Sequence, residues 1–187
     1  VLRMESVPDS DHDGWPDLHE RVYGTDAMDA ASRPEGRSFR VRLETGWNLL
    51  SLPIVPDIES PKTLFDLPGT APVWRWVVDE ANGTGDYRAV ERIRPHTAYW
   101  VFSSEAKEQI ITGVLHQVDR VRLPKGWNPC GVGGPVALPE GMRNGAVVWQ
   151  WSAERQSYER NEEGILEEGR GYWIFSPQDI QLDVRPE

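Results

Sequence analysis

The segment DSDHDGWPDLHE, residues 9–20, carries acidic side chains at a spacing that suits a metal ion. It runs Asp-x-Asp-x-Asp-Gly from Asp9 and is closed by Glu20, the pattern of a calcium loop. In such a loop alternate side chains converge on one point, and Gly14 permits the sharp turn. The carbonyl of Trp15 supplies another oxygen, and Glu20 closes the shell with both carboxylate oxygens. The spacing therefore predicts a Ca2+ site.

Two other interpretations of these acids are a solvated surface loop and a catalytic carboxylate cluster. Five oxygen ligands with a glycine at the required position favour the ion over a solvated loop. Catalysis requires a pocket and paired environments, which a terminal loop seldom offers. Calcium suits so crowded an oxygen shell better than magnesium does. His12 and His19 fall at positions that do not point at the ion, and we expect them at the surface.

A short helix is expected after the loop, because Pro16 suits a first helical turn and Gly24 suits a helix end. The segment DSDHDGWPDLHERVYGTDAMD, residues 9–29, resembles the thrombospondin type 3 repeats, an EF-hand-like half-unit without an entering helix. This resemblance implies calcium binding outside the cell, in a spacer or stalk. The ligands that it implies are the side chains of Asp9, Asp11, Asp13, Asp17 and Glu20 and the carbonyl of Trp15. Asp26 and Asp29 are either part of an incomplete second site or plain surface residues, since no further repeat follows them.

The composition describes a globular protein with an acidic balance. Hydrophobic residues make up 39% and charged residues 27% of the chain, and no run approaches the roughly 18 apolar residues of a membrane span. The formal net charge of -10 argues against nucleic acid and anionic membranes as partners, because both attract basic patches. Cys130 is the only cysteine, which excludes an internal disulfide and a thiolate zinc site.

The chain also contains an internal repeat, which predicts two copies of one structural unit. The segments that align are residues 41–54 with 121–134, 73–76 with 148–151, and 87–103 with 158–176. Eight of the nine tryptophans pair in this way: Trp47 with Trp127, Trp74 with Trp149, Trp76 with Trp151, and Trp100 with Trp173.

Within each repeat the pattern is typical of β-strands. Segments such as FRVRL, VWRWVV and GYWIFS are short, rich in β-branched and aromatic residues, and bounded by Gly, Pro, Asn or Asp. NGTGD at 82–86 predicts a hairpin turn, and SPKTLFDLPG suits one or two helical turns. The expected fold class is all-β, with two pseudo-twofold-related β-rich repeats forming one compact unit, preceded by the calcium loop and its helix. The expected domains are the connector at 1–37, β-repeat 1 at 38–116 and β-repeat 2 at 117–187.

The tryptophans have a structural and a functional interpretation. Trp100 and Phe102 share one face of a strand whose other face is also apolar, which indicates a central or interfacial strand. Because a ligand site rarely needs every residue twice, we expect the paired tryptophans to form the hydrophobic cores of the two repeats, one core in each lobe. The alternative is an exposed platform for sugar rings, as in carbohydrate-binding modules. Its residues would be Trp74, Trp76, Trp100, Trp149, Trp151 and Trp173.

The pattern from GWNLLSLP to YWVF, over residues 39–184, also resembles a tandem Trp-rich β module found near the C-termini of large secreted or surface-anchored microbial proteins. PCGVGG departs from the apolar strand expected after Trp127, and leaves the register of that strand open. The sequence has no nucleophile elbow, no His-Glu-x-x-His and no Gly-rich phosphate loop, and His96 and His116 are isolated. We therefore expect no enzymatic activity.

These observations predict a non-enzymatic calcium-binding module, extracellular or on the cell surface, for adhesion, surface display or protein–protein interaction. Ca2+ would rigidify the junction between a stalk and the β-domain, and any secretion signal would lie outside this sequence. The expected partners are Ca2+ and another protein or a surface component, without nucleic acid or membrane insertion. The alternative is a carbohydrate-binding module with a glycan ligand. Asn82 lies in a glycosylation sequon, which matters only in a eukaryotic host.

Overall fold

The structure is a computed structural model, in which the chain divides into two compact units. The described residues are 8–13, 15, 17, 20, 25–32, 36–69, 71–78, 84–115, 120–139, 142 and 145–184. The first unit spans Val1–Ser38 and the second spans Phe39–Glu187. Some sequence predictions concern residues outside the described ranges, namely Gly14, Pro16, His19, Gly24, Asn82 and His116.

The second unit consists mainly of short antiparallel strands, so the predicted all-β fold class is confirmed. Lobe 1 contains β1 (Gly36–Leu43), β2 (Gly46–Leu50), β3 (Ile54–Pro56), β4 (Trp74–Val78), β5 (Gly85–Ala89), β6 (Tyr99–Ser103) and β7 (Lys107–Leu115). Lobe 2 contains β8 (Arg120–Leu123), β9 (Gly126–Cys130), β10 (Val136–Ala137), β11 (Val147–Ser152), β12 (Ser157–Arg160), β13 (Ile165–Leu166), β14 (Tyr172–Ser176) and β15 (Ile180–Asp183).

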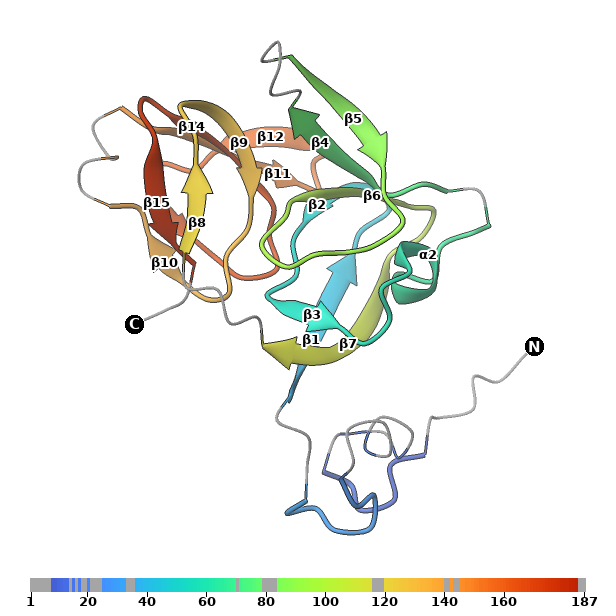
Figure 1. The fold of residues 1–187 in the computed structure, drawn as a ribbon. Coiled ribbons are helices and arrows are strands. Elements are labelled where there is room, and N and C mark those ends of the chain that lie inside the picture. Colours follow the sequence, from blue (N-terminus) through green and yellow to red (C-terminus); the bar gives the residue numbers. More distant parts are fainter. Residues whose placement is uncertain are drawn as a thin grey trace. The chain divides into compact units, whose positions relative to one another are not determined.

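Each lobe contains a four-stranded sheet with the same arrangement (Figure 1). The strand order is β2-β6-β4-β5 in lobe 1 and β9-β14-β11-β12 in lobe 2. Lobe 1 adds the three-stranded sheet β1-β7-β3, and lobe 2 adds the pairs β8-β15 and β10-β13. The strands of the two four-stranded sheets correspond one to one, as the internal repeat requires.

Equivalent strands also pair in equivalent registers. Trp47 of β2 lies opposite Phe102 of β6, and Trp127 of β9 lies opposite Phe175 of β14. The sequence PCGVGG therefore leaves the register of β9 unchanged, and this strand ends at Cys130. The thiol of Cys130 is buried, and this burial raises its pKa to about 12.

Each lobe packs its own apolar core against one face of its four-stranded sheet. Tyr99 and Val101 of β6 belong to the core of lobe 1, and Tyr172 and Ile174 of β14 belong to the core of lobe 2. The two tyrosine hydroxyls each accept a backbone hydrogen bond of 2.8 Å, and burial raises the pKa of both phenols. The repeat in the sequence is thus a repeat of core packing as well.

The paired tryptophans do not form these cores, so that prediction is wrong. Neither core contains any of them. The physical reason is strand alternation: the geometry that turns Tyr99 and Val101 inward turns Trp100 to the opposite face of β6. β6 does lie between β2 and β4, as expected for a strand that is apolar on both faces.

One helical turn interrupts the strands of lobe 1. Helix α2 (Pro61–Leu64) begins with proline, whose fixed φ and missing N–H suit a first turn, and it buries Pro61 and Leu64. It confirms the helical turn expected within SPKTLFDLPG. Among the described residues, no helix has the length and apolar character needed to cross a membrane.

The two lobes join where backbone segments approach closely. The N–H of Gly131 donates to the carbonyl of His96 at 3.0 Å, and that of Gly171 donates to Leu49 at 3.1 Å. A Cβ atom on Gly131 would lie 2.2 Å from the Cβ of Ser51, its counterpart in the repeat. Because only glycine permits this approach, packing against the other lobe accounts for the glycine after Cys130.

Candidate functional site

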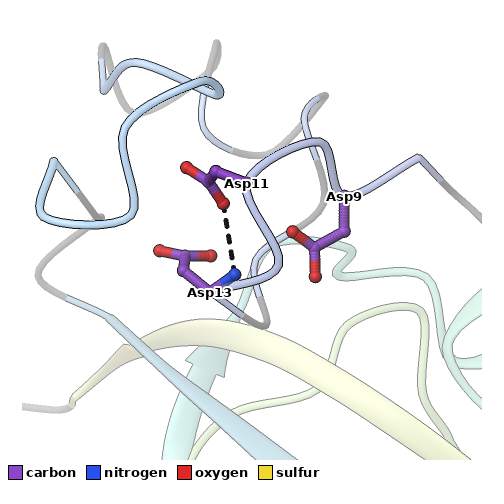
Figure 2. Close-up of side chains that lie close together, drawn as sticks. All are labelled: Asp9, Asp11 and Asp13. Atoms are coloured by element: carbon purple, nitrogen blue, oxygen red, sulfur yellow. Dashed lines mark hydrogen bonds between the residues drawn. The ribbon is translucent and has the colours of Figure 1, made fainter.

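Three aspartates of the acidic loop lie together (Figure 2). Asp9, Asp11 and Asp13 each offer a carboxylate oxygen, and these oxygens all lie within 4.8 Å of one another. All three residues are partly buried. Charges this close repel one another, and a cation placed between them would neutralise the repulsion.

The loop folds through short bonds between its own side chains and backbone. The N–H of Asp13 donates to Asp11 Oδ1 at 3.2 Å, and the N–H of Trp15 donates to Asp13 Oδ1 at 2.7 Å. His12 has a φ of 61°, which lets the chain turn between the acids. Each of these two carboxylates keeps a second oxygen, Oδ2, that is buried and accepts no hydrogen bond from the described residues.

Glu20 supplies a fourth carboxylate at this end of the chain. Its side chain is 0% exposed, and its Oε2 atom also accepts no hydrogen bond from the described residues. Burial and the nearby charges of Asp11 and Asp13 raise the pKa of Glu20, while a hydrogen bond from Thr25 opposes the shift. A buried carboxylate among like charges is the environment that a divalent cation stabilises.

The remaining predicted ligands lie differently. Both carboxylate oxygens of Asp17 accept hydrogen bonds of 2.7 Å from Ser10, one from its N–H and one from its hydroxyl, so this side chain closes the loop. Trp15 is buried, with 7% of its surface exposed. Asp26 and Asp29 are exposed and accept hydrogen bonds from backbone N–H groups two residues later, as turn residues do.

The described part of the loop contains a group of carboxylates that could hold a metal ion. Calcium prefers about six to eight hard oxygen ligands, mostly from carboxylates and carbonyls. Asp9, Asp11 and Asp13 converge as the spacing predicts, and Glu20 is buried beside their charge. Such an ion could be coordinated by the buried carboxylate oxygens of Asp11, Asp13 and Glu20.

A second feature of the molecule is a pair of aromatic clefts on the β-unit. Cleft A has a volume of about 590 Å³ and cleft B a volume of about 520 Å³. The described residues that line cleft A are Trp47, Trp74, Tyr87, Trp100, Trp151 and Tyr158. Those that line cleft B are Trp76, Tyr87, Trp127, Trp149, Tyr158 and Trp173. Both clefts therefore draw on both lobes, and they share the two tyrosines.

The rings meet edge to face across the boundary between the lobes. Trp100 of lobe 1 contacts Trp151 of lobe 2 with ring centroids 4.9 Å apart at 81°. The reciprocal pair, Trp76 of lobe 1 and Trp173 of lobe 2, lies at 5.5 Å and 72°. Edge-to-face pairs are favourable because the positive ring edge meets the negative ring face. The tryptophans thus contact one another across the boundary between the lobes, and they also line the two clefts.

Hydrogen bonds fix several of these rings. Trp151 Nε1 donates to the backbone carbonyl of Trp47 at 2.7 Å, and Trp100 Nε1 donates to the hydroxyl of Tyr87 at 3.3 Å. Gln156 accepts from the N–H of Trp47 at 2.8 Å and donates to its carbonyl at 3.0 Å. The bonds from Trp151 and Gln156 to Trp47 cross between the lobes and hold the wall of cleft A in place.

Sequence reasoning found only some of these residues. The predicted platform tryptophans all line one cleft or the other, but Trp47 and Trp127 were not included in it. Neither were Tyr87 and Tyr158, although the repeat alignment places them at equivalent positions. This equivalence in the repeat alignment could have identified the two tyrosines as candidate cleft residues.

Comparisons of the chain with protein-family models, with curated proteins and with solved structures found no match.

Proposed function

We propose that the chain is a non-enzymatic extracellular binding module whose connector, residues 1–37, is held rigid by Ca2+. The observation that carries this proposal is the convergence of the carboxylates of Asp9, Asp11 and Asp13, with Glu20 buried near the charges of Asp11 and Asp13. Ion binding would order the loop, because a ligand that binds only the folded form stabilises that form. Adhesion, surface display and protein–protein interaction are roles in which such a rigid connector is useful.

Calorimetry on chelator-treated protein tests the calcium site. We expect one Ca2+ per chain, and an affinity reduced roughly tenfold or more by Asp11→Asn, because affinity depends on the number of ligand charges. Asparagine keeps the oxygen that accepts the N–H of Asp13, so the change removes charge while preserving the turn.

Asp29→Asn is the matched control for this variant. It removes one charge from the same unit and keeps the acceptor for the N–H of Ala31, but Asp29 lies outside the aspartate group. Its calcium affinity should equal that of the unmodified protein. Equal effects of the two variants, or no heat of binding at all, would refute the calcium proposal.

The β-unit supplies the binding surface in this proposal. Trp47 and Trp127 are 38% and 46% exposed, and they line clefts A and B respectively. Large exposed apolar patches on soluble proteins usually mark interaction sites. We assign the two clefts as the place where this module contacts its ligand.

A further inference from the structure

The rings of each cleft form corners and not a flat platform. Around Trp100, the rings of Trp47, Trp151 and Tyr158 stand at 87°, 81° and 87° to it. In cleft B, the ring of Trp173 stands at 72° and 77° to those of Trp76 and Trp127. A sugar ring stacks best on one flat face, whereas ring faces at right angles suit a rounded group.

The clefts offer few polar partners to a ligand. Every described residue in their lining is Trp or Tyr. In cleft A the indole N–H groups of Trp100 and Trp151 already donate within the protein. A polar ligand loses its bonds to water on entering such a site and regains few of them.

This lining discriminates among ligand classes. A saccharide carries many hydroxyls, and a primary ammonium or guanidinium carries several N–H donors, so each would leave polar groups without partners. A quaternary ammonium group has no N–H to satisfy. Its positive charge is attracted to the faces of aromatic rings, most strongly to those of tryptophan.

The charge of the protein favours a cation over a neutral apolar group. Residues 39–187, which form the unit with the clefts, carry 21 acidic and 16 basic side chains, and the described lining of both clefts contains no basic residue. The long-range field therefore attracts cations and repels anions.

We infer that clefts A and B are paired aromatic cages that each bind a quaternary ammonium group of the choline type. This inference rests on the proposed role of the clefts as the ligand-binding surface, and it names the chemical class of the ligand. The pseudo-twofold relation between the lobes makes the two cages equivalent, so one chain takes two such groups.

Titration with choline chloride, followed by calorimetry and tryptophan fluorescence, tests this inference. The neutral isostere 3,3-dimethylbutan-1-ol has the same shape without the charge, and ethanolamine has the charge with N–H donors. We expect two choline molecules per chain and about tenfold weaker binding of both comparison compounds. Equal binding of the neutral isostere, or no binding of choline at millimolar concentration, would overturn the inference.

Single substitutions separate the two cages. Trp47→Ala removes a wall of cleft A and Trp127→Ala the equivalent wall of cleft B, so each variant should bind one choline molecule and the double variant none. Ile110→Ala is the control, because Ile110 is exposed and lines neither cleft. Thermal unfolding verifies that each variant is folded. If a tryptophan variant does not fold, the comparison of choline with its isostere on the unmodified protein decides the matter.

Two further measurements identify the source of the ligand and keep this inference separate from the proposed function. If the protein sediments with phosphatidylcholine vesicles and free choline releases it, the natural ligand is a lipid head group. If the protein binds free choline but not the vesicles, the natural ligand is a soluble compound. Both results support the quaternary ammonium class. A saccharide that quenches tryptophan fluorescence where choline does not would refute this ligand class and leave the clefts as the binding surface.

Discussion

Individual residues of the two sites differ in how far the sequence could predict them. The aspartate spacing predicts the convergence of Asp9, Asp11 and Asp13, because alternate positions of a tight turn face one point. The same spacing does not reveal that Asp17 bonds to Ser10, since that contact depends on the path of the folded loop. Repeat alignment marks Tyr87 and Tyr158 as equivalent, yet their place in both clefts depends on how the lobes pack.

Tyr158 has a pKa that can be measured directly. The pKa of its phenol is raised from 10.0 to about 12, mainly by burial and to a smaller extent by the neighbouring Tyr87. Between about pH 10 and 12 the unfolded chain therefore loses this proton while the folded chain keeps it, so stability falls as the pH rises through this window and is unaffected below it.

Tyr158→Phe should remove this contribution. The phenolate absorbance of the unmodified protein minus that of the variant should titrate with a midpoint near 12, and the variant should lose less stability across the alkaline window. A difference curve centred near the ordinary tyrosine value would contradict the environment described for this residue.

Secondary-structure elements were predicted better than the contacts between them. Strand type and the one-turn helix α2 followed from local composition, and the equivalence of β6 and β14 followed from the repeat. The placement of the tryptophans was predicted wrongly, because alternation on β6 shows which residues share a face but not which face meets the core. The glycine at 131, directly after β9, likewise has its closest approach in the other lobe, at Ser51.

Gly131 provides a test of the contact between the lobes. Gly131→Ala would place a Cβ atom 2.2 Å from that of Ser51, so neighbouring backbone must move. We expect a loss of about 1–3 kcal/mol in the free energy of unfolding, measured by denaturant titration. Gly145→Ala is the matched control, because its nearest neighbour is Pro177 at 3.5 Å and the residue is exposed. Similar losses in both variants would contradict the close approach.

Across the whole molecule, the internal repeat explains more of the structure than any local motif. Two lobes with the same sheet order each pack a core, and their joining surface carries the paired tryptophans. The aromatic clefts arise from this pairing, so neither lobe alone contains a complete cleft. The acidic loop belongs to the other compact unit, and its chemistry is set within residues 9–20.

A crystal structure of the protein grown with millimolar CaCl2 would test the calcium site. We expect an ion with anomalous signal about 2.3–2.6 Å from oxygens of Asp9, Asp11, Asp13 and Glu20. Clear density for the loop with only water among these carboxylates, or with Glu20 turned to solvent, would contradict a calcium site here.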